Sequence, residues 1–185
     1  MRHTISHLVS AFALIVAACT KGDTAPKSQS AETEVKVPGM SQGGTATTIH
    51  LVVQGGAHAG TYDAQSSDLT CTYGFAGPGS WGNQYSVTGK SPNEFSSLQL
   101  IVPDAKDAAD GTDKFLLTAG FGEPMKSGYS EHTINAAADG EKEGHGRVIV
   151  QDRGQTGKVT FQGKTKDNVT LEGTIDCHQL MRGGE

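Results

Sequence analysis

The sequence predicts an all-β fold: a single antiparallel β-sandwich of about ten short strands, with a closed β-barrel as the alternative. Apolar residues make up only 35% of the 185 residues and aromatic residues 6%, while Gly alone contributes 25 residues. Beyond residue 45, apolar and polar residues alternate, and turn-forming pairs such as Asp110-Gly111 separate the alternating runs. After the leader, no window of about 11 or more residues keeps a helical period. These patterns exclude a helical bundle or a multi-span membrane protein.

The first element is a leader over residues 1–18. Arg2 supplies a positive charge, Leu8–Val16 is an apolar run, and the small residues Ala17 and Ala18 follow. This order is typical of a secretory signal. The run is too short to cross a bilayer as a helix, which needs ~20 apolar residues.

The leader ends in Val16-Ala17-Ala18-Cys19, which resembles the lipobox of bacterial lipoproteins. The resemblance implies a diacylglycerol on the Cys19 thiol, cleavage before Cys19 and acylation (for example by palmitate) of the new amino terminus. Several acyl chains, each contributing ~0.8 kcal/mol per buried methylene, form a stable membrane anchor. The alternative is an ordinary secretory signal with a chance cysteine.

Thr20 occupies the position where lipoproteins retained on the inner membrane of enteric-type bacteria carry Asp. The resemblance therefore implies a place in the cell envelope, on the outer membrane where the host has one. Without an outer membrane, it implies the outer face of the cytoplasmic membrane.

Residues 19–44 hold the lipidated cysteine and a segment rich in Pro, Gly, Ser and Gln without apolar periodicity. This composition predicts a disordered tether whose 25 residues after Cys19 reach roughly 25–30 Å. The all-β domain then covers residues 45–185. Of the 15 basic residues, Arg2 lies in the leader, which leaves 14 against 20 acidic residues. This balance argues against a nucleic-acid partner.

The clearest strand expected within the domain covers residues 169–177. There Leu171, Ile175 and Cys177 point to one face, while Thr170 and Asp176 point to the other. Similar alternation predicts strands near residues 49–53, 69–73 and 98–102. Weaker patterns predict further strands near residues 60–63, 84–88, 114–121, 129–135, 147–151 and 158–164.

Two cysteines, Cys71 and Cys177, remain once Cys19 is assigned to lipid. Each lies on the apolar face of an expected strand, and an even number in an exported domain predicts a disulfide. The loop that it closes spans about 106 residues, for which chain entropy gives ~4–5 kcal/mol and measured disulfides more often 2–4. A metal-binding or reactive pair is less favoured because neither cysteine has a C-x-x-C partner.

The order of these parts is similar to that of the mycobacterial lipoprotein antigen family. The parts are a lipobox, a polar linker and an all-β domain with one cysteine early and one in its last strand. This resemblance implies a small, disulfide-linked surface domain. It transfers no functional residue to this chain.

Motifs for catalysis are missing from the sequence: G-x-S-x-G, S-x-x-K, H-E-x-x-H and the P-loop do not occur. Asp176 and His178 share a strand face, where a solvated pair is the default interpretation. We therefore predict no catalytic residue, no metal site and no cofactor. The five histidines beyond the leader are scattered along the chain: His50, His58, His132, His145 and His178.

An aspartate-rich loop offers the one weak calcium signal, because clustered carboxylates on a Gly-containing loop suit that ion. The spacing differs from that of an EF-hand, and a solvated loop is the default. Its members are Asp104, Asp107, Asp110 and Asp113.

Four aromatic residues form the densest aromatic cluster: Tyr73, Phe75, Trp81 and Tyr85. Glycines separate them, so the rings could form a stacking platform for sugars or a contact for a protein partner. They could equally turn inward, since a core with few apolar residues needs its large rings. The sequence leaves these two interpretations open.

Together, these observations predict an exported, lipid-anchored protein of the cell envelope that acts as a non-catalytic binding or surface module. Its ligand is expected to be a glycan or a protein. The alternatives are an envelope hydrolase acting on the cell wall or on glycans, and a purely structural surface coat.

Overall fold

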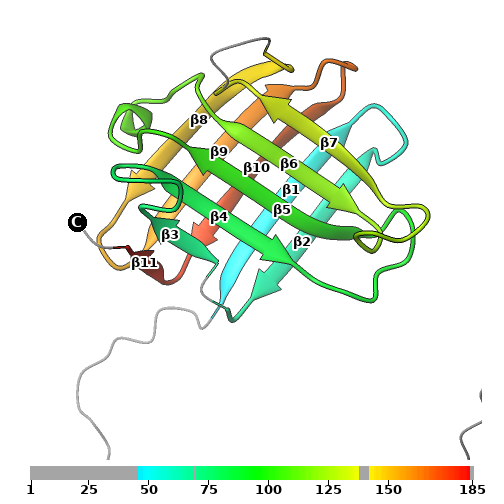
Figure 1. Ribbon diagram of the computed structural model, residues 1–185, viewed down its shortest axis with the longest axis horizontal. Coiled ribbons are helices and arrows are strands. Elements are labelled where there is room, and N and C mark those ends of the chain that lie inside the picture. The colour runs from blue at the N-terminus through cyan, green and yellow to red at the C-terminus, as the bar shows by residue number, and fades with distance from the viewer. Residues whose placement is uncertain (1–45, 69, 138–141, 184–185) are drawn as a thin grey trace, which may run out of the picture. The chain divides into compact units, whose positions relative to one another are not determined.

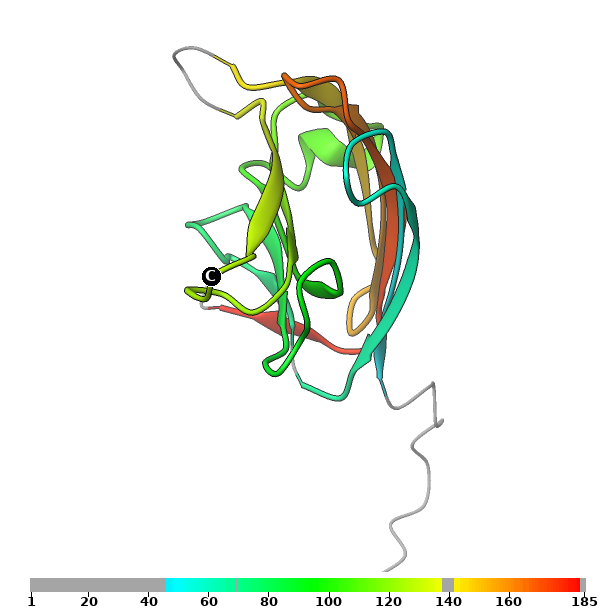
Figure 2. The same ribbon diagram turned by 90° about the vertical axis from the view of Figure 1, so that its right-hand side faces the viewer.

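The computed structural model describes residues 46–68, 70–137 and 142–183. The leader, Cys19, the tether and Leu69 lie outside this range. Within it, two sheets pack face to face, and their strands cross rather than run alongside one another (Figures 1 and 2). No helix in the described part of the chain is long and apolar enough to cross a membrane.

The first sheet has five strands, and every neighbouring pair is antiparallel. Its strands, in spatial order, are β2 (Gly60–Ser66), β1 (Thr47–Gln54), β10 (Thr170–Cys177), β9 (Gly157–Lys164) and β8 (His145–Asp152).

The second sheet has six strands and is antiparallel except for one short pair, β11 and β3. A bulge between Phe95 and Ser97 turns Ser96 inward, where its hydroxyl donates to the Gly120 carbonyl at 3.1 Å. A short 3₁₀ helix, η1 (Asp107–Ala109), lies between β5 and β6. In spatial order the strands are β11 (Leu180–Arg182), β3 (Cys71–Tyr73), β4 (Trp81–Ser86), β5 (Phe95–Val102), β6 (Leu116–Phe121) and β7 (Ser130–Asn135).

The core fills the space between the sheets because alternate side chains of each strand point inward. Leu51 of β1 and Leu100 of β5, one from each sheet, are fully buried. The predicted phase of residues 169–177 is confirmed: Leu171, Ile175 and Cys177 are buried, whereas Asp176 is exposed.

The β-sandwich is therefore confirmed, and the closed barrel is wrong because the two sheets keep separate edge strands. A strand occurs near each of the ten expected positions within the described residues. The sequence missed only β11, which is three residues long and shows no alternation.

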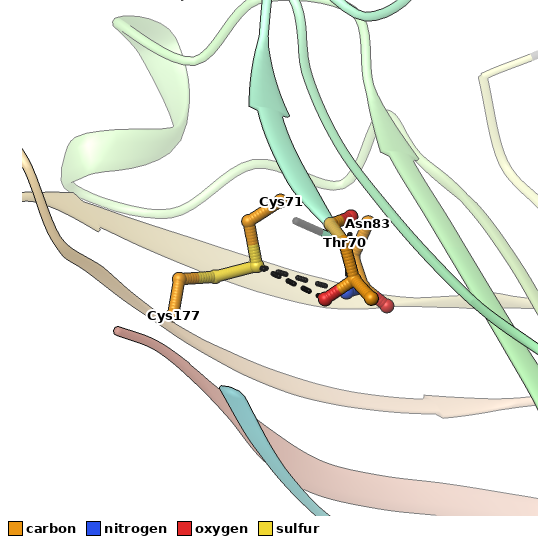
Figure 3. Close-up of a disulfide and its surroundings, with 4 residues drawn as sticks. All are labelled: Thr70, Cys71, Asn83 and Cys177. Carbon is orange, nitrogen blue, oxygen red and sulfur yellow. Dashed lines mark hydrogen bonds between the residues drawn. A yellow bond between two sulfur atoms is a disulfide. The ribbon is translucent and has the colours of Figure 1, made fainter. Parts of the chain in front are cut away.

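The expected disulfide is present (Figure 3). Cys71 of β3 and Cys177 of β10 join the two sheets with a Cα–Cα separation of 6.1 Å, and both are fully buried. The buried Asn83 lies beside the bond, and its amide donates to the Thr70 carbonyl at 3.3 Å. The disulfide thus crosses the core instead of closing a surface loop.

Candidate binding face

Two of the four clustered aromatic residues belong to the core. Trp81 is 1% exposed and Tyr85 6%, because alternate residues of β4 point between the sheets. Tyr85 stacks against Phe95 with ring centroids 5.7 Å apart, and burial raises the pKa of its hydroxyl. The ligand-binding interpretation fails for Trp81 and Tyr85, since a ligand cannot reach these rings in the folded domain.

Tyr73 is covered by the end of the chain. The Arg182 guanidinium lies 5.2 Å from the centroid of its ring and also donates to both carboxylate oxygens of Asp152, at 2.6 and 2.8 Å. Burial alone would raise the pKa of Asp152, but these bonds, the Gly154 amide and the Arg182 charge lower it. Tyr73 therefore takes part in closing one end of the sandwich.

Phe75 is the only one of the four whose ring lies on the outer face of the six-stranded sheet. The turn after β3 folds back over β4, held by a 2.7 Å bond from the Gly74 amide to the Ser80 carbonyl. The ring rests directly on Gly82, where a Cβ would lie 2.5 Å from Phe75 Cγ. Gly82 is therefore required for this close approach, and Phe75 stays partly exposed.

A second ring lies on the same face in the same way. Tyr129 covers Gly120 of β6, where a Cβ would lie 2.6 Å from the Tyr129 hydroxyl oxygen. That hydroxyl donates to Glu131 Oε1 at 2.6 Å, and burial followed by this bond raises its pKa. Sequence reasoning missed Tyr129. The available signal was glycine in the interior of an expected strand, which marks a close approach of another group.

Between the two rings runs a strip of neutral polar side chains. Gln84, Gln99, Thr118 and Thr133 are directly opposite one another across β4, β5, β6 and β7. The two threonine hydroxyls are 3.3 Å apart. We call these four residues, with Phe75 and Tyr129, the platform.

The strand register sets the size of the platform. Gly82 under Phe75 pairs with Ile101, and Gly120 under Tyr129 pairs with Ser97. The two glycines are therefore four residues apart along the strands and two strands apart across the sheet. At ~3.3 Å per residue and ~4.8 Å per strand, the two glycines that the rings cover are roughly 16 Å apart.

Two histidines that are far apart in the sequence meet at the side of the sandwich. His58 is 6% exposed, stacks on Phe121 at 4.2 Å, and its Nδ1 lies 3.0 Å from His132 Nε2. Burial, and then the neighbouring His58, lower the pKa of His132, although Asp167 opposes them. His58 joins the β1–β2 turn to β7 and fixes how these segments meet.

The other ring nitrogen of His58, Nε2, faces Ser130 Oγ and Asn93 Oδ1, each at 3.2 Å. A Ser–His–His chain of this kind could activate a serine only if Nε2 accepted the hydroxyl proton. The Asn93 carbonyl oxygen instead requires a proton on Nε2. This geometry favours a structural network over a nucleophile and its base.

Asp176 and His178, which share a strand face in the sequence pattern, do not interact in the structure: within the described residues, no hydrogen bond or ion pair joins them. His178 Nδ1 is buried without a partner. A different pair forms on the outer face of the five-stranded sheet, where His50 Nδ1 lies 2.8 Å from Asp63 Oδ1.

The aspartate-rich loop uses one carboxylate for its own turn. Asp104 Oδ1 accepts the backbone amides of Lys106 and Asp107 at 2.9 and 3.2 Å. In the part of the chain that the structure describes, no three His, Cys, Asp or Glu side chains are grouped to hold a metal ion.

No protein-family model, curated protein or solved structure matches this chain at a significant level. The platform and the histidine network therefore have to be interpreted from their own geometry.

Proposed function

We propose that this protein is a lipid-anchored, non-catalytic module of the cell envelope that binds a neutral glycan on the platform. In this proposal the Cys19 lipid holds the chain at the membrane, and the tether extends the sandwich away from it. The membrane is the outer one where the host has one, and otherwise the outer face of the cytoplasmic membrane. The lipobox Val16–Cys19 and the polar segment after it support this arrangement.

The observation that carries glycan binding is the pair of partly exposed aromatic side chains, Phe75 and Tyr129, each packed over a strand glycine at either side of a strip of neutral polar side chains. An aromatic face packs against the C–H groups of a sugar ring, while amides and hydroxyls exchange hydrogen bonds with its hydroxyls. Gln84 and Gln99 supply both donors and acceptors for such an exchange. The strip itself carries no ionisable group. Glu131, whose carboxylate accepts the Tyr129 hydroxyl proton in a 2.6 Å hydrogen bond, is a charged group at its edge, so the platform suits a neutral ligand better than an anionic one.

The experiment is a calorimetric titration of the exported protein, purified in detergent, with neutral oligosaccharides of the bacterial cell wall and of plant and fungal origin. Phe75→Ala should weaken binding by a hot-spot amount, about 2 kcal/mol, without loss of fold. Gly82→Ala should have a similar effect because the added methyl group displaces the Phe75 ring.

The matched control is Met125→Ala, which removes a fully exposed apolar side chain from the β6–β7 turn without changing any of the six platform residues. It should bind like the parent protein. Unchanged affinity in Phe75→Ala, or no binding to any neutral glycan, would contradict the proposal. Capture of a protein instead would favour the protein-ligand alternative.

The non-catalytic part of the proposal rests on the proton that Asn93 requires on His58 Nε2. The purified protein should release no reducing ends from envelope glycans, and a fluorophosphonate probe should leave Ser130 unlabelled. Labelling of Ser130 that His58→Gln abolishes would favour the hydrolase instead.

A further inference from the structure

A groove with a different character crosses the outer face of the five-stranded sheet, over β8, β9 and β10. Its polar side chains are those of His145, Arg147, Gln162, Lys164 and Thr170, and we call these five residues the cationic groove. We propose that the cationic groove binds the phosphate group of a phosphate ester. It is a second site, independent of the platform, which lies on the other sheet.

The strand register brings the basic side chains together. His145 pairs with Lys164 across β8 and β9, and Arg147 follows His145 at the next outward position. Arg147 is opposite Gln162 and is therefore a diagonal neighbour of Lys164, a separation that long side chains can bridge. This crowding occurs in a chain with 20 acidic residues against 15 basic ones, so it does not follow from an excess of basic residues.

Within the described residues, neither Arg147 nor Lys164 has a carboxylate partner, a condition that they share with Lys106, Lys114 and Lys158. Lys90, Lys126 and Lys166 each form an ion pair with a glutamate. The outward carboxylate in the Arg147 row, Glu172, lies beyond Gln162. It accepts hydrogen bonds from Gln54 at 3.1 Å and from Gln162 at 3.5 Å.

Arg147 is held in place before any ligand arrives. One terminal nitrogen of its guanidinium donates to the Asp110 carbonyl. The group also lies against Gly111, whose φ of 100° and missing side chain allow this approach. A guanidinium has five N–H donors, so this single bond leaves others for a ligand. Fixing the side chain beforehand lowers the entropy that binding would otherwise cost.

The donor set suits a phosphate group. A guanidinium and an ammonium group form charge-assisted hydrogen bonds to phosphate oxygens, and the Thr170 hydroxyl adds a neutral donor at the same place. A phosphate ester reaches the cell envelope as a lipid headgroup or as part of a soluble or polymeric compound. Both sources present the same chemistry to the cationic groove.

The first arm of the experiment follows amide chemical shifts of the exported chain, in neutral detergent, during titration with glycerol phosphate. The shifts should cluster at the cationic groove, and Arg147→Gln and Lys164→Gln should each weaken binding about tenfold. The matched control is Lys158→Gln, which removes the same charge from the outer face of the same strand, six residues away. It should bind within about twofold of the parent.

The second arm identifies the source of the phosphate. The Cys19→Ala variant, which lacks the cysteine proposed to carry the lipid, is mixed with phosphatidylcholine vesicles that contain or lack phosphatidylglycerol. Flotation of the vesicles then measures how much protein they bind. Flotation that needs phosphatidylglycerol and is lost in Arg147→Gln supports a lipid headgroup. Binding of glycerol phosphate alone supports a soluble or polymeric ester. No binding in either arm, or an equal loss in Lys158→Gln, would overturn the proposal.

Discussion

Trp81 is the largest side chain that the core buries completely. Glycines surround it, as in an exposed binding loop, yet β4 begins at Trp81 and its alternation turns the ring inward. Because the ring is 1% exposed, Trp81→Ala should lower the free energy of unfolding by about 3–5 kcal/mol. Urea denaturation followed by circular dichroism measures this loss.

Phe75→Ala is the control for that substitution, because Phe75 lies on the outer face and is only partly buried. It should reduce stability by much less than Trp81→Ala. A red-shifted, readily quenched emission from this sole tryptophan in the native protein would show that Trp81 is not in the core.

His132 makes stability depend on pH at the single-residue level. Burial and the neighbouring His58 lower its pKa below the ordinary value of 6.5. As pH falls through about 6.5, the unfolded chain takes up a proton before the folded domain does. The contribution of His132 to the free energy of unfolding should therefore be constant above that pH. It should decrease below that pH, until the pH reaches the pKa of His132 in the folded domain.

Unfolding free energies measured at about pH 7.5 and about pH 5.5 test this dependence. His132→Gln, which keeps a donor for His58 Nδ1 but does not titrate, should reduce the difference between the two values. A parent protein as stable at the lower pH, or an unchanged difference in His132→Gln, would contradict this role of His132.

At the scale of elements, β3 and β10 depend on the bond between Cys71 and Cys177. β3 is only three residues long and pairs with a second three-residue strand, β11. Reduction, or replacement of both cysteines by Ala, should lower stability by about 2–4 kcal/mol. Thermal unfolding with and without reductant checks this value.

The control is Cys19→Ala, which removes the third cysteine and leaves the disulfide intact. This variant should have the same melting temperature as the parent protein. Two thiols at positions 71 and 177 that alkylate readily in the native protein would show that the disulfide does not form.

The elements themselves were largely predictable, because alternation depends on local sequence. The long strands β1, β9 and β10 bury one face each, so their apolar residues recur at every second position. β11 was not predictable, since its three residues carry no such period and its partner β3 is more than 100 residues away in sequence.

For the whole molecule, the sandwich followed from the sequence but the sites did not. His58 and His132 are 74 residues apart, and only the packing of one sheet on the other brings them to 3.0 Å. The platform likewise needs a turn to fold Phe75 back over Gly82. Alternation in the sequence predicts which face of a sheet a residue lies on, but not which residues of other strands lie beside it. Neither the histidine network nor the arrangement of the platform could therefore be predicted.

The proposed lipid anchor concerns the whole chain and rests on the resemblance of Val16–Cys19 to a lipobox. Replacing Cys19 by Ala should move the protein from the detergent phase to the aqueous phase, or leave it as an uncleaved precursor. Phase partitioning with mass spectrometry of the amino-terminal peptide measures both outcomes. A variant that still fractionates with membranes as the parent does would contradict lipidation at Cys19.

The most direct test of glycan binding is an amide chemical-shift map of the exported protein, recorded during titration with the neutral oligosaccharide that binds best. The predicted changes cluster on β4, β5, β6 and β7 and at Phe75 and Tyr129, and they leave the outer face of β8, β9 and β10 unaffected. Changes confined to the five-stranded sheet, or no changes at saturating glycan, would contradict a glycan-binding platform.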